Sequence, residues 1–315
     1  MTPAPAAEWA ERGERSNLLA LRVMAWVATT LGRPLARALL HPIALYFLAA
    51  AAAPRRHSRR YLARVRGRPP RWREVYGHFH AFAATVLDRV YFVRGRLAGF
   101  DIRLLGLEHV DAALAEGRGA VLLGAHLGSF EALHAIGESR PGLRVKMAMY
   151  PDNARKIHRV LQALAPAFGL GIIAIGRRGA TLEIRDELDR GGLVGLLGDR
   201  FLDGDAREGR AGASTRLPFL GTDARFTDGP LRLALLLRRR VIFMVALYRG
   251  GRRYDVRFMP LADFRAPPAE PAAREQALRL ALQAYVAQLE ALVREAPLNW
   301  FNFHDFWDDD APHAP

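Results

Sequence analysis

The chain of 315 residues contains no cysteine. It therefore forms no disulfide and offers no thiolate nucleophile, iron–sulfur cluster or cysteine-type zinc site. This absence leaves the redox compartment open, because a chain without thiols is compatible with both oxidising and reducing surroundings. Hydrophobic residues make up 50% of the sequence, which is enough for a full core, so we expect one large α/β domain with an appendage.

The fingerprints of several enzyme classes are missing as well. The chain has no phosphate-binding loop and no glycine pattern for a dinucleotide, so nothing predicts a cofactor. Ser129 lies in the segment LGSFE, which lacks both glycines of the Gly-x-Ser-x-Gly turn of serine hydrolases. Glu131 and His134 form one Glu-x-x-His pair, whereas a di-iron bundle needs two, so we expect no metal.

Acidic residues are absent between Glu14 and Glu74, and nine arginines lie between Arg55 and Arg73. In a chain with a net charge of +14, this basic arm is suited to nucleic acid, anionic lipid or an acidic protein. It is not accompanied by a recognition helix, an RNA-binding sheet motif or a zinc module. We therefore expect no nucleic-acid partner.

No apolar run in the sequence reaches the roughly 20 residues that span a bilayer comfortably. Residues 38–53 form an uncharged run of sixteen, preceded by the amphipathic-looking segment NLLALRVMAWVATTLG. We expect residues 17–53 to lie in the membrane interface, to dip into one leaflet or to cross it, with a buried helical hairpin as the alternative. The predicted division is a membrane-associating segment and basic arm over residues 1–70, followed by an α/β domain over residues 71–315.

From residue 100 onward, short apolar runs alternate with helical patterns. This alternation is typical of a mostly parallel sheet flanked by helices, in which ligands bind at the carboxyl ends of the strands. The predicted strands lie at residues 120–124, 143–150, 171–176 and 192–199, and the predicted helices lie near 73–95, 128–137, 154–167, 179–190 and 272–296.

His126 follows the first of these strands, and Glu131 comes five positions later. A neutral imidazole accepts a proton near pH 7, and a carboxylate can hold its other nitrogen and stabilise the imidazolium. The neighbouring Gly124 and Gly128 leave the backbone open to a ligand. The spacing thus predicts a general base, with an ordinary structural His–Glu pair as the alternative.

Two later strand ends also carry charge. Arg177 and Arg178 follow the strand at 171–176, while Asp199 and Arg200 end the strand at 192–199. Guanidinium groups in such positions can bind phosphate in a bidentate manner, although a solvated salt bridge is the more common role of a single arginine. We expect these charges to face the same crevice as His126.

The segment HLGSFE resembles the His-x4-Asp/Glu motif of the lysophospholipid acyltransferase superfamily, in the glutamate form of the bacterial late lipid A acyltransferases. Further blocks resemble that group in the expected order over about residues 70–305. They are MYPDNARKIHRVLQAL, IAIGRRG, LLGDR and LPFLGTDARFTDGPLRLALLLRRRVIFMVALYR. The resemblance implies an α/β fold with a mostly parallel central sheet and N-terminal membrane-associated helices.

The resemblance also implies the reaction. A membrane-associated O-acyltransferase would move a fatty acyl group from an acyl thioester of acyl carrier protein or CoA to a hydroxyl of a lipid acceptor. His126 would be the general base, with Glu131 orienting it and no covalent acyl-enzyme. Arg177, Arg178, Asp199 and Arg200 would bind the substrate or support the site.

The acceptor implied by the resemblance is lipid A-like or aryl polyene-type. The segment LLGDR lacks the acid-glycine-threonine sequence of glycerolipid acyltransferases, which argues against glycerol phosphate. The ending NWFNFHDFW resembles a compact bacterial branch associated with outer-membrane lipid and aryl polyene pathways. Its aromatic residues, Trp300 among them, are expected in the core, and alternate members are candidates for lining an acyl channel.

The expected location is the cytoplasmic face of a bacterial inner membrane, with the membrane surface as a partner. Two alternatives to the transferase stay open at this point. One is a non-catalytic membrane-binding scaffold, and the other is a thioesterase or hydrolase that uses the same His/Glu pair. The oligomeric state, the length of the acyl chain and the choice between the two thioester donors do not follow from the sequence.

Overall fold

The computed structural model describes residues 18–133, 143–149, 171–200 and 214–307. Their centre is a seven-stranded sheet in the order β1-β9-β8-β2-β5-β3-β4, and β6 and β7 pair as a separate antiparallel hairpin. The strands are β1 (Asp101–Leu105), β2 (Ala120–Gly124), β3 (Val145–Met149), β4 (Gly171–Ala174), β5 (Leu193–Leu197), β6 (Ser214–Phe219), β7 (Thr222–Thr227), β8 (Arg240–Tyr248) and β9 (Arg253–Asp263).

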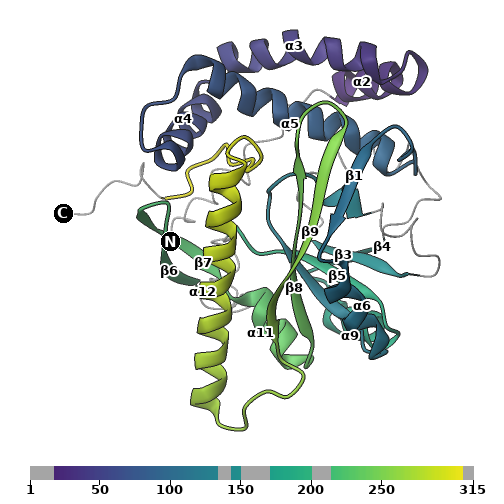
Figure 1. The fold of residues 1–315 in the computed structure, drawn as a ribbon, viewed down its shortest axis with the longest axis vertical. Helices are drawn as coiled ribbons and strands as arrows, with labels where there is room; N and C mark the ends of the chain where they lie inside the picture. The colour runs from purple at the N-terminus through teal and green to yellow at the C-terminus, as the bar shows by residue number, and fades with distance from the viewer. Residues whose placement is uncertain (1–17, 134–142, 150–170, 201–213, 308–315) are drawn as a thin grey trace, which may run out of the picture.

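The helices surround this sheet (Figure 1). They are α2 (Leu18–Thr30), α3 (Arg33–Ala50), α4 (Ala52–Arg66), α5 (Trp72–Phe92), α6 (Leu107–Ala115), α9 (Ala180–Asp189), α11 (Gly229–Leu236) and α12 (Pro271–Glu295), with a short 3-10 helix, η1, at Phe130–Leu133.

Five neighbouring strands, β8, β2, β5, β3 and β4, run parallel to one another. Strand β9 is antiparallel to β8, and β1 is parallel to β9, so these two run in the opposite direction. The predicted α/β fold with a mostly parallel sheet is confirmed. The helix predicted near 154–167 and most of the block MYPDNARKIHRVLQAL lie outside the described residues.

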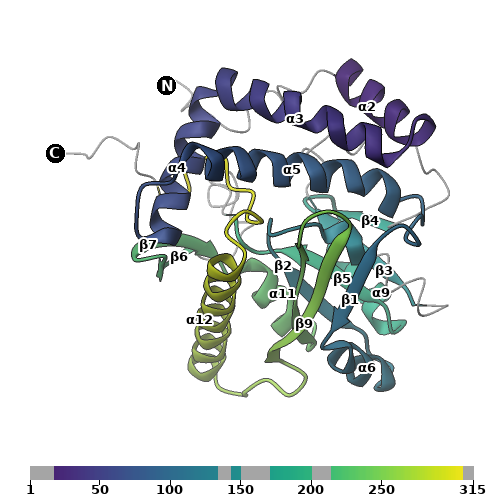
Figure 2. The same cartoon turned by 45° about the horizontal axis from the view of Figure 1, so that its top comes forward.

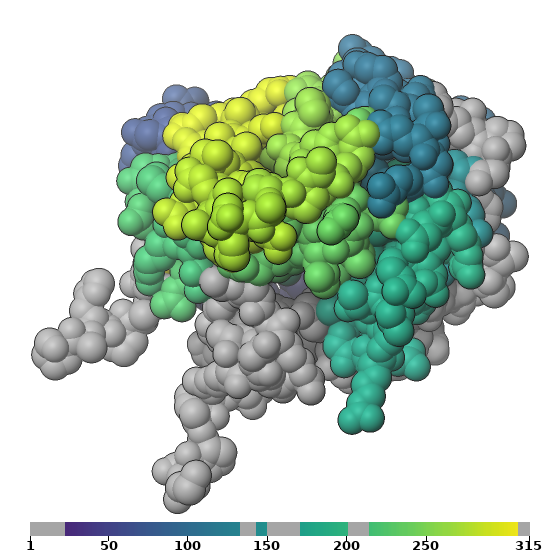
Figure 3. All heavy atoms as spheres, turned by 90° about the horizontal axis from the view of Figure 1, so that it is seen from below, coloured from purple at the N-terminus to yellow at the C-terminus, as the bar shows by residue number. Residues whose placement is uncertain are grey.

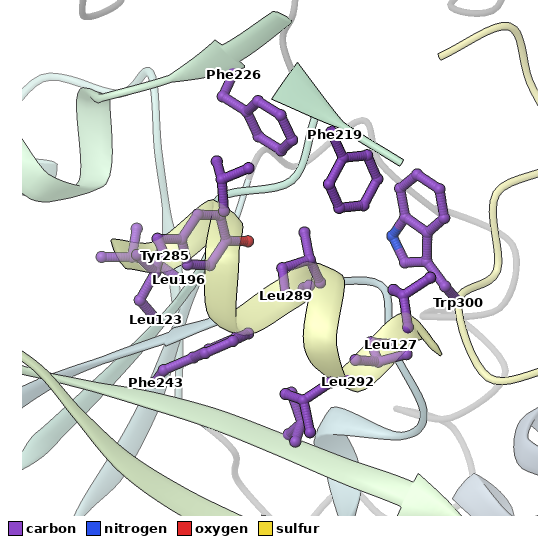
Figure 4. Packing of buried hydrophobic residues seen from close by; sticks show 14 of the residues in the cluster. Leu123, Leu127, Leu196, Phe219, Phe226, Phe243, Tyr285, Leu289, Leu292 and Trp300 are labelled. Carbon is purple, nitrogen blue, oxygen red and sulfur yellow. The ribbon is translucent and has the colours of Figure 1, made fainter. Parts of the chain in front are cut away.

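The central strand β2 is buried along its whole length because both faces of the sheet are covered. Successive side chains point to opposite faces, so Val121 and Leu123 join the core beneath α12. Ala120 and Leu122 join a second core that faces α5 and α6. Figure 4 shows Tyr285 of α12 packed among the residues of the first core, and α12 covers much of the surface seen from below in Figure 3.

Helix α5 crosses the end of the sheet at which the parallel strands finish (Figures 1 and 2). Val75 and Phe79 in its first half belong to the core beneath α12. Ala84 and Leu87 in its second half belong to the core on the other face. The helix therefore passes from one side of the sheet to the other and closes over the carboxyl ends of the strands, where the site residues were predicted.

Helix α3 lies on the outer side of α5, with α2 beside it (Figure 2). The uncharged run at residues 38–53 is not one continuous helix, since α3 ends at Ala50 and α4 starts at Ala52. Among the described residues, no single helix is long and apolar enough to cross a membrane. Helices α3 and α4 meet that criterion only as a pair, and the pair is bent by 95°.

A buried carboxylate fastens α3 to the rest of the protein. Asp88 of α5 is fully buried and pairs with Arg33 through two hydrogen bonds of 2.8 Å. The hydroxyl of Tyr254 in β9 donates a third bond to Asp88. The Arg33 guanidinium also donates to the carbonyl of Gly251 in the β8–β9 turn. One residue thus links α3, α5 and the sheet.

We expect Asp88→Asn to lower the free energy of unfolding by about 3 kcal/mol, because it leaves the largely buried Arg33 without its counter-charge. Urea unfolding followed by circular dichroism measures the change. Asp186→Asn on the exposed surface of α9 is the matched control and should change stability by less than about 0.5 kcal/mol. Equal effects of the two substitutions would contradict a role of Asp88 in stability.

Candidate active site

The backbone around His126 is held on both sides by hydrogen bonds. The amide of Gly128 donates to the carbonyl of Asn299 at 2.9 Å, and the amide of Ser129 donates to the carbonyl of Ala246 in β8 at 3.0 Å. The amide of Phe301 donates to the His126 carbonyl at 2.9 Å. The loop after β2 is therefore fixed between the end of β8 and the C-terminal segment.

Glycines make this close packing possible. Gly128 has a φ of +77°, and a Cβ atom there would lie 1.8 Å from the carbonyl oxygen of Ala246. The ring of Phe130 in η1 packs over Gly195 of β5, where an added Cβ would lie 2.3 Å from the ring. The turn after β2 can thus sit flat against its two neighbouring strands.

Asp199 is the direct partner of the His126 imidazole. Its Oδ1 atom lies 2.8 Å from Nδ1 of His126, and its Oδ2 atom accepts hydrogen bonds of 3.0 Å from the His126 amide and from Nε1 of Trp300. Strand β5 pairs with β2 in parallel register, so it delivers Asp199 beside the end of β2. The sequence predicted both residues at strand ends, and the structure brings them together.

The charge state of this pair follows from its surroundings. Burial raises the pKa of Asp199, but His126, the Arg200 guanidinium and the Trp300 hydrogen bond together hold it below its ordinary value. An ionised carboxylate only accepts hydrogen bonds, so the hydrogen of neutral His126 lies on Nδ1. Nε2 then has a free lone pair, which is the form of imidazole that can accept a proton.

Two effects keep His126 neutral near pH 7. Burial and the positive charge of Arg200 lower the pKa of His126, and these effects outweigh the opposing influence of Asp199. Arg200 itself donates a long hydrogen bond of 3.4 Å to the carbonyl of Phe301, beside the His126 backbone. The described part of the site therefore combines an unprotonated imidazole, a buried carboxylate and the guanidinium of Arg200.

Glu131 has a different partner from the one predicted. Its Oε2 atom accepts a hydrogen bond of 3.0 Å from the Ser129 hydroxyl and pairs with Nε of Arg89 in α5 at 2.9 Å. The orienting contact to Nδ1 of His126 belongs to Asp199 instead. The physical reason is that β5 places Asp199 next to the imidazole, while η1 directs Glu131 toward α5. Glu131 therefore fastens the loop that carries His126.

Arg177 and Arg178 lie at the carboxyl end of β4, and both are exposed. Strands β5 and β3 separate β4 from β2, so at about 4.8 Å per strand the two strand ends are roughly 14 Å apart. These arginines share the edge of the sheet with His126, but they are not its neighbours. A single crevice that holds all of these residues would have to extend from the end of β2 to the end of β4.

Sequence reasoning missed the contacts of three residues around the site. Trp300 was expected only to pack in the core or to line an acyl channel, yet its indole binds Asp199 across 101 positions of the sequence. Nε2 of His78 lies 2.9 Å from the Trp300 carbonyl, and burial lowers the pKa of His78 to about 4. His304 is also buried, and burial together with the positive charge of Arg200 lowers its pKa to about 3. No short-range pattern in the sequence predicts these tertiary contacts.

The family model of the bacterial lipid A biosynthesis acyltransferases matches residues 16–308, which is nearly the whole chain. The chain therefore belongs to this family, and it is an acyltransferase. The predicted resemblance is confirmed. No curated protein matches the chain.

We expect Gly128→Ala to reduce transfer activity by about a hundredfold or more, because the new methyl group would displace the loop that carries His126. Gly179→Ala is a matched control, since Gly179 has a φ of +88° but no atom within 4 Å of an added Cβ. Both variants carry the strain of a positive φ, but only the first has the clash. Similar activity of the two variants would show that the close approach to Ala246 is unimportant.

Proposed function

We propose that the protein transfers a fatty acyl group from an acyl thioester to a hydroxyl group of a lipid A-like or aryl polyene-type lipid, with His126 as the general base. The observation that carries this proposal is the hydrogen bond of 2.8 Å between His126 and Asp199. It leaves Nε2 unprotonated at the edge of the sheet where ligands of parallel α/β proteins bind.

The reaction then proceeds by direct transfer. Nε2 of His126 takes the proton of the acceptor hydroxyl while the hydroxyl oxygen attacks the thioester carbonyl. Asp199 stabilises the imidazolium that forms, in the way a carboxylate stabilises histidine in a hydrolase triad. When the tetrahedral intermediate collapses, the carbon–sulfur bond breaks and the departing thiolate takes the proton from Nε2. The guanidinium of Arg200 stabilises the negative charge on the carbonyl oxygen.

The arginines farther along the edge have a separate role in this proposal. Arg177 and Arg178 follow the end of β4, which lies roughly 14 Å from the end of β2, and in this proposal they do not contact the reacting carbonyl. They are suited instead to a phosphate of the donor or the acceptor that lies away from the reacting atoms. Acyl carrier protein is the proposed donor, with CoA as the second candidate, since both are acidic and the chain is strongly basic.

The test is acyl transfer in membranes that contain the full-length protein, using a labelled acyl-carrier-protein thioester and extracted bacterial lipids. We expect His126→Ala to lower formation of acylated lipid about a thousandfold, the usual order for removal of a general base. His109→Ala on α6 replaces a half-exposed histidine outside the site and should keep full activity.

Mass spectrometry of the products separates the competing functions. A histidine-dependent acylated lipid supports the transferase and identifies its acceptor. Release of free fatty acid without an acylated lipid would point to a thioesterase. Full transfer by His126→Ala would refute the assignment of the general base.

We also propose that the protein docks on the cytoplasmic face of the bacterial inner membrane through the outer face of α2 and α3. This outer apolar face consists of Val23, Trp26, Leu31, Leu35, Leu39, Leu45 and Tyr46, all exposed. The opposite side of α3, with Ala36, Leu40 and Ala44, is buried. Exposure of an apolar face of this size to water is unfavourable, and aromatic residues such as Trp26 favour the membrane interface.

We expect Leu35→Ser combined with Leu45→Ser to weaken binding to phospholipid vesicles roughly thirtyfold, since each half-exposed leucine contributes about 1 kcal/mol when it enters the interface. Leu182→Ser combined with Leu280→Ser is the matched control, because these two leucines are 55% exposed on α9 and α12. Cosedimentation with vesicles measures the binding. A loss of the same size in the control pair would contradict docking through α3.

A further inference from the structure

Helix α4 carries a strongly basic exposed face next to the candidate active site. It contains six arginines and no carboxylate. Its buried side consists of His57, Ser58, Tyr61, Leu62 and Val65. The opposite side exposes Arg56, Arg59 and Arg66, which recur at helical spacing and which we call the α4 basic stripe.

One arginine of the stripe, Arg66, pairs with a carboxylate of the next helix, α5. Glu74 pairs with Arg66 and Arg68, at 3.0 and 2.8 Å. Among the described residues Arg59 has no ion-pair partner, although it sits in the middle of the stripe. A helix face of this kind attracts an anionic partner and raises the rate at which that partner arrives.

The buried side of α4 is connected to the catalytic pair through hydrogen bonds. Oγ of Ser58 lies 2.8 Å from Nδ1 of His78, whose Nε2 lies 2.9 Å from the Trp300 carbonyl. The Trp300 indole donates to Asp199, which holds His126. A partner bound to the exposed side of α4 is therefore one helix thickness, about 10–12 Å, from the residues that support the site.

The direction of α4 distinguishes an acidic protein from a membrane as this partner. Helix α4 leaves α3 at 95°, and both ribbon views place it on the sheet side of α3 (Figures 1 and 2). The hydroxyl of Tyr61 donates to the carbonyl of Pro297, so α4 runs down along the C-terminal segment. A bilayer on the outer apolar face of α2 and α3 would have α4 pointing away from it, toward the aqueous side.

We propose that the α4 basic stripe is the docking surface for the acidic carrier protein that delivers the acyl thioester. The proposal rests on the proposed acyl-transfer function. The carrier binds by charge complementarity, and its long pantetheine arm passes beside α4 to bring the thioester carbonyl to His126. Phosphate contacts by Arg177 and Arg178 at the far edge of the sheet are separate from this surface.

The test compares Arg59→Glu with Arg279→Glu in the full-length protein. Both residues lie in the middle of an exposed helix face, and neither has an ion-pair partner among the described residues. Arg279 belongs to α12, which forms part of the surface seen in Figure 3. With acyl carrier protein as donor at low salt, we expect Arg59→Glu to lower kcat/KM about tenfold and Arg279→Glu to leave it unchanged. Adding Arg56→Glu to Arg59→Glu should deepen the loss.

A second donor separates docking from chemistry. S-acyl-pantetheine carries the same thioester without an acidic protein, so Arg59→Glu should use it as well as the wild type does. Equal losses with both donors, or no loss with either, would overturn the proposal. Weaker binding of Arg59→Glu to anionic phospholipid vesicles would also overturn it, because the stripe would then be a membrane contact.

Direct binding keeps this test independent of the reaction. Fluorescently labelled carrier protein is titrated onto wild type and Arg59→Glu, and we expect about tenfold weaker binding by the variant, with the difference disappearing at high salt. A wild type that transfers no acyl group from any donor would refute the proposed function alone. Equal binding by the two proteins would refute the docking surface alone.

Discussion

The buried carboxylate of Asp199 joins three parts of the chain that are far apart in sequence. It binds the imidazole and the amide of His126 after β2, it belongs to the end of β5, and it accepts the indole hydrogen of Trp300. A carboxylate out of water is unfavourable unless such donors surround it. These contacts set the position and tautomer of His126, while burial and the positive charge of Arg200 lower its pKa. The proposed chemistry depends on both.

A second buried carboxylate, Asp88, joins separate parts of the chain in the same way and holds helix α3 to the rest of the protein. Asp88 binds Arg33 and Tyr254, so α3 is attached through α5 to the sheet whose strand ends carry His126 and Asp199. The outer apolar face on α2 and α3 and the basic stripe on α4 consequently have fixed orientations relative to His126. A lipid acceptor that arrives from the side of α3 and a carrier protein that arrives along α4 would meet at the same edge of the sheet.

The contacts of Glu131 differ from the contact that its spacing from His126 predicts. The spacing of His126 and Glu131 predicts a direct pair, but the carboxylate binds Ser129 and Arg89. It holds the loop to α5 and so supports the imidazole indirectly. Arg89 also adds its positive charge to the effects that lower the pKa of His126, so the ion pair of Glu131 and Arg89 acts on the imidazole.

The sequence by itself determined the strands that end at the site, since continuous apolar runs such as Ala120–Gly124 report burial on both faces of a sheet. It also placed His126, Asp199 and Arg200 at strand ends, because charged residues directly after such runs have few other places to lie. Only the tertiary structure decided which residues touch. The order of the strands puts β5 rather than β4 beside β2, and therefore Asp199 rather than Arg177 beside His126. Trp300 contacts Asp199 because the C-terminal segment packs against the sheet. These positions are 101 residues apart, so no short-range pattern in the sequence indicates their contact.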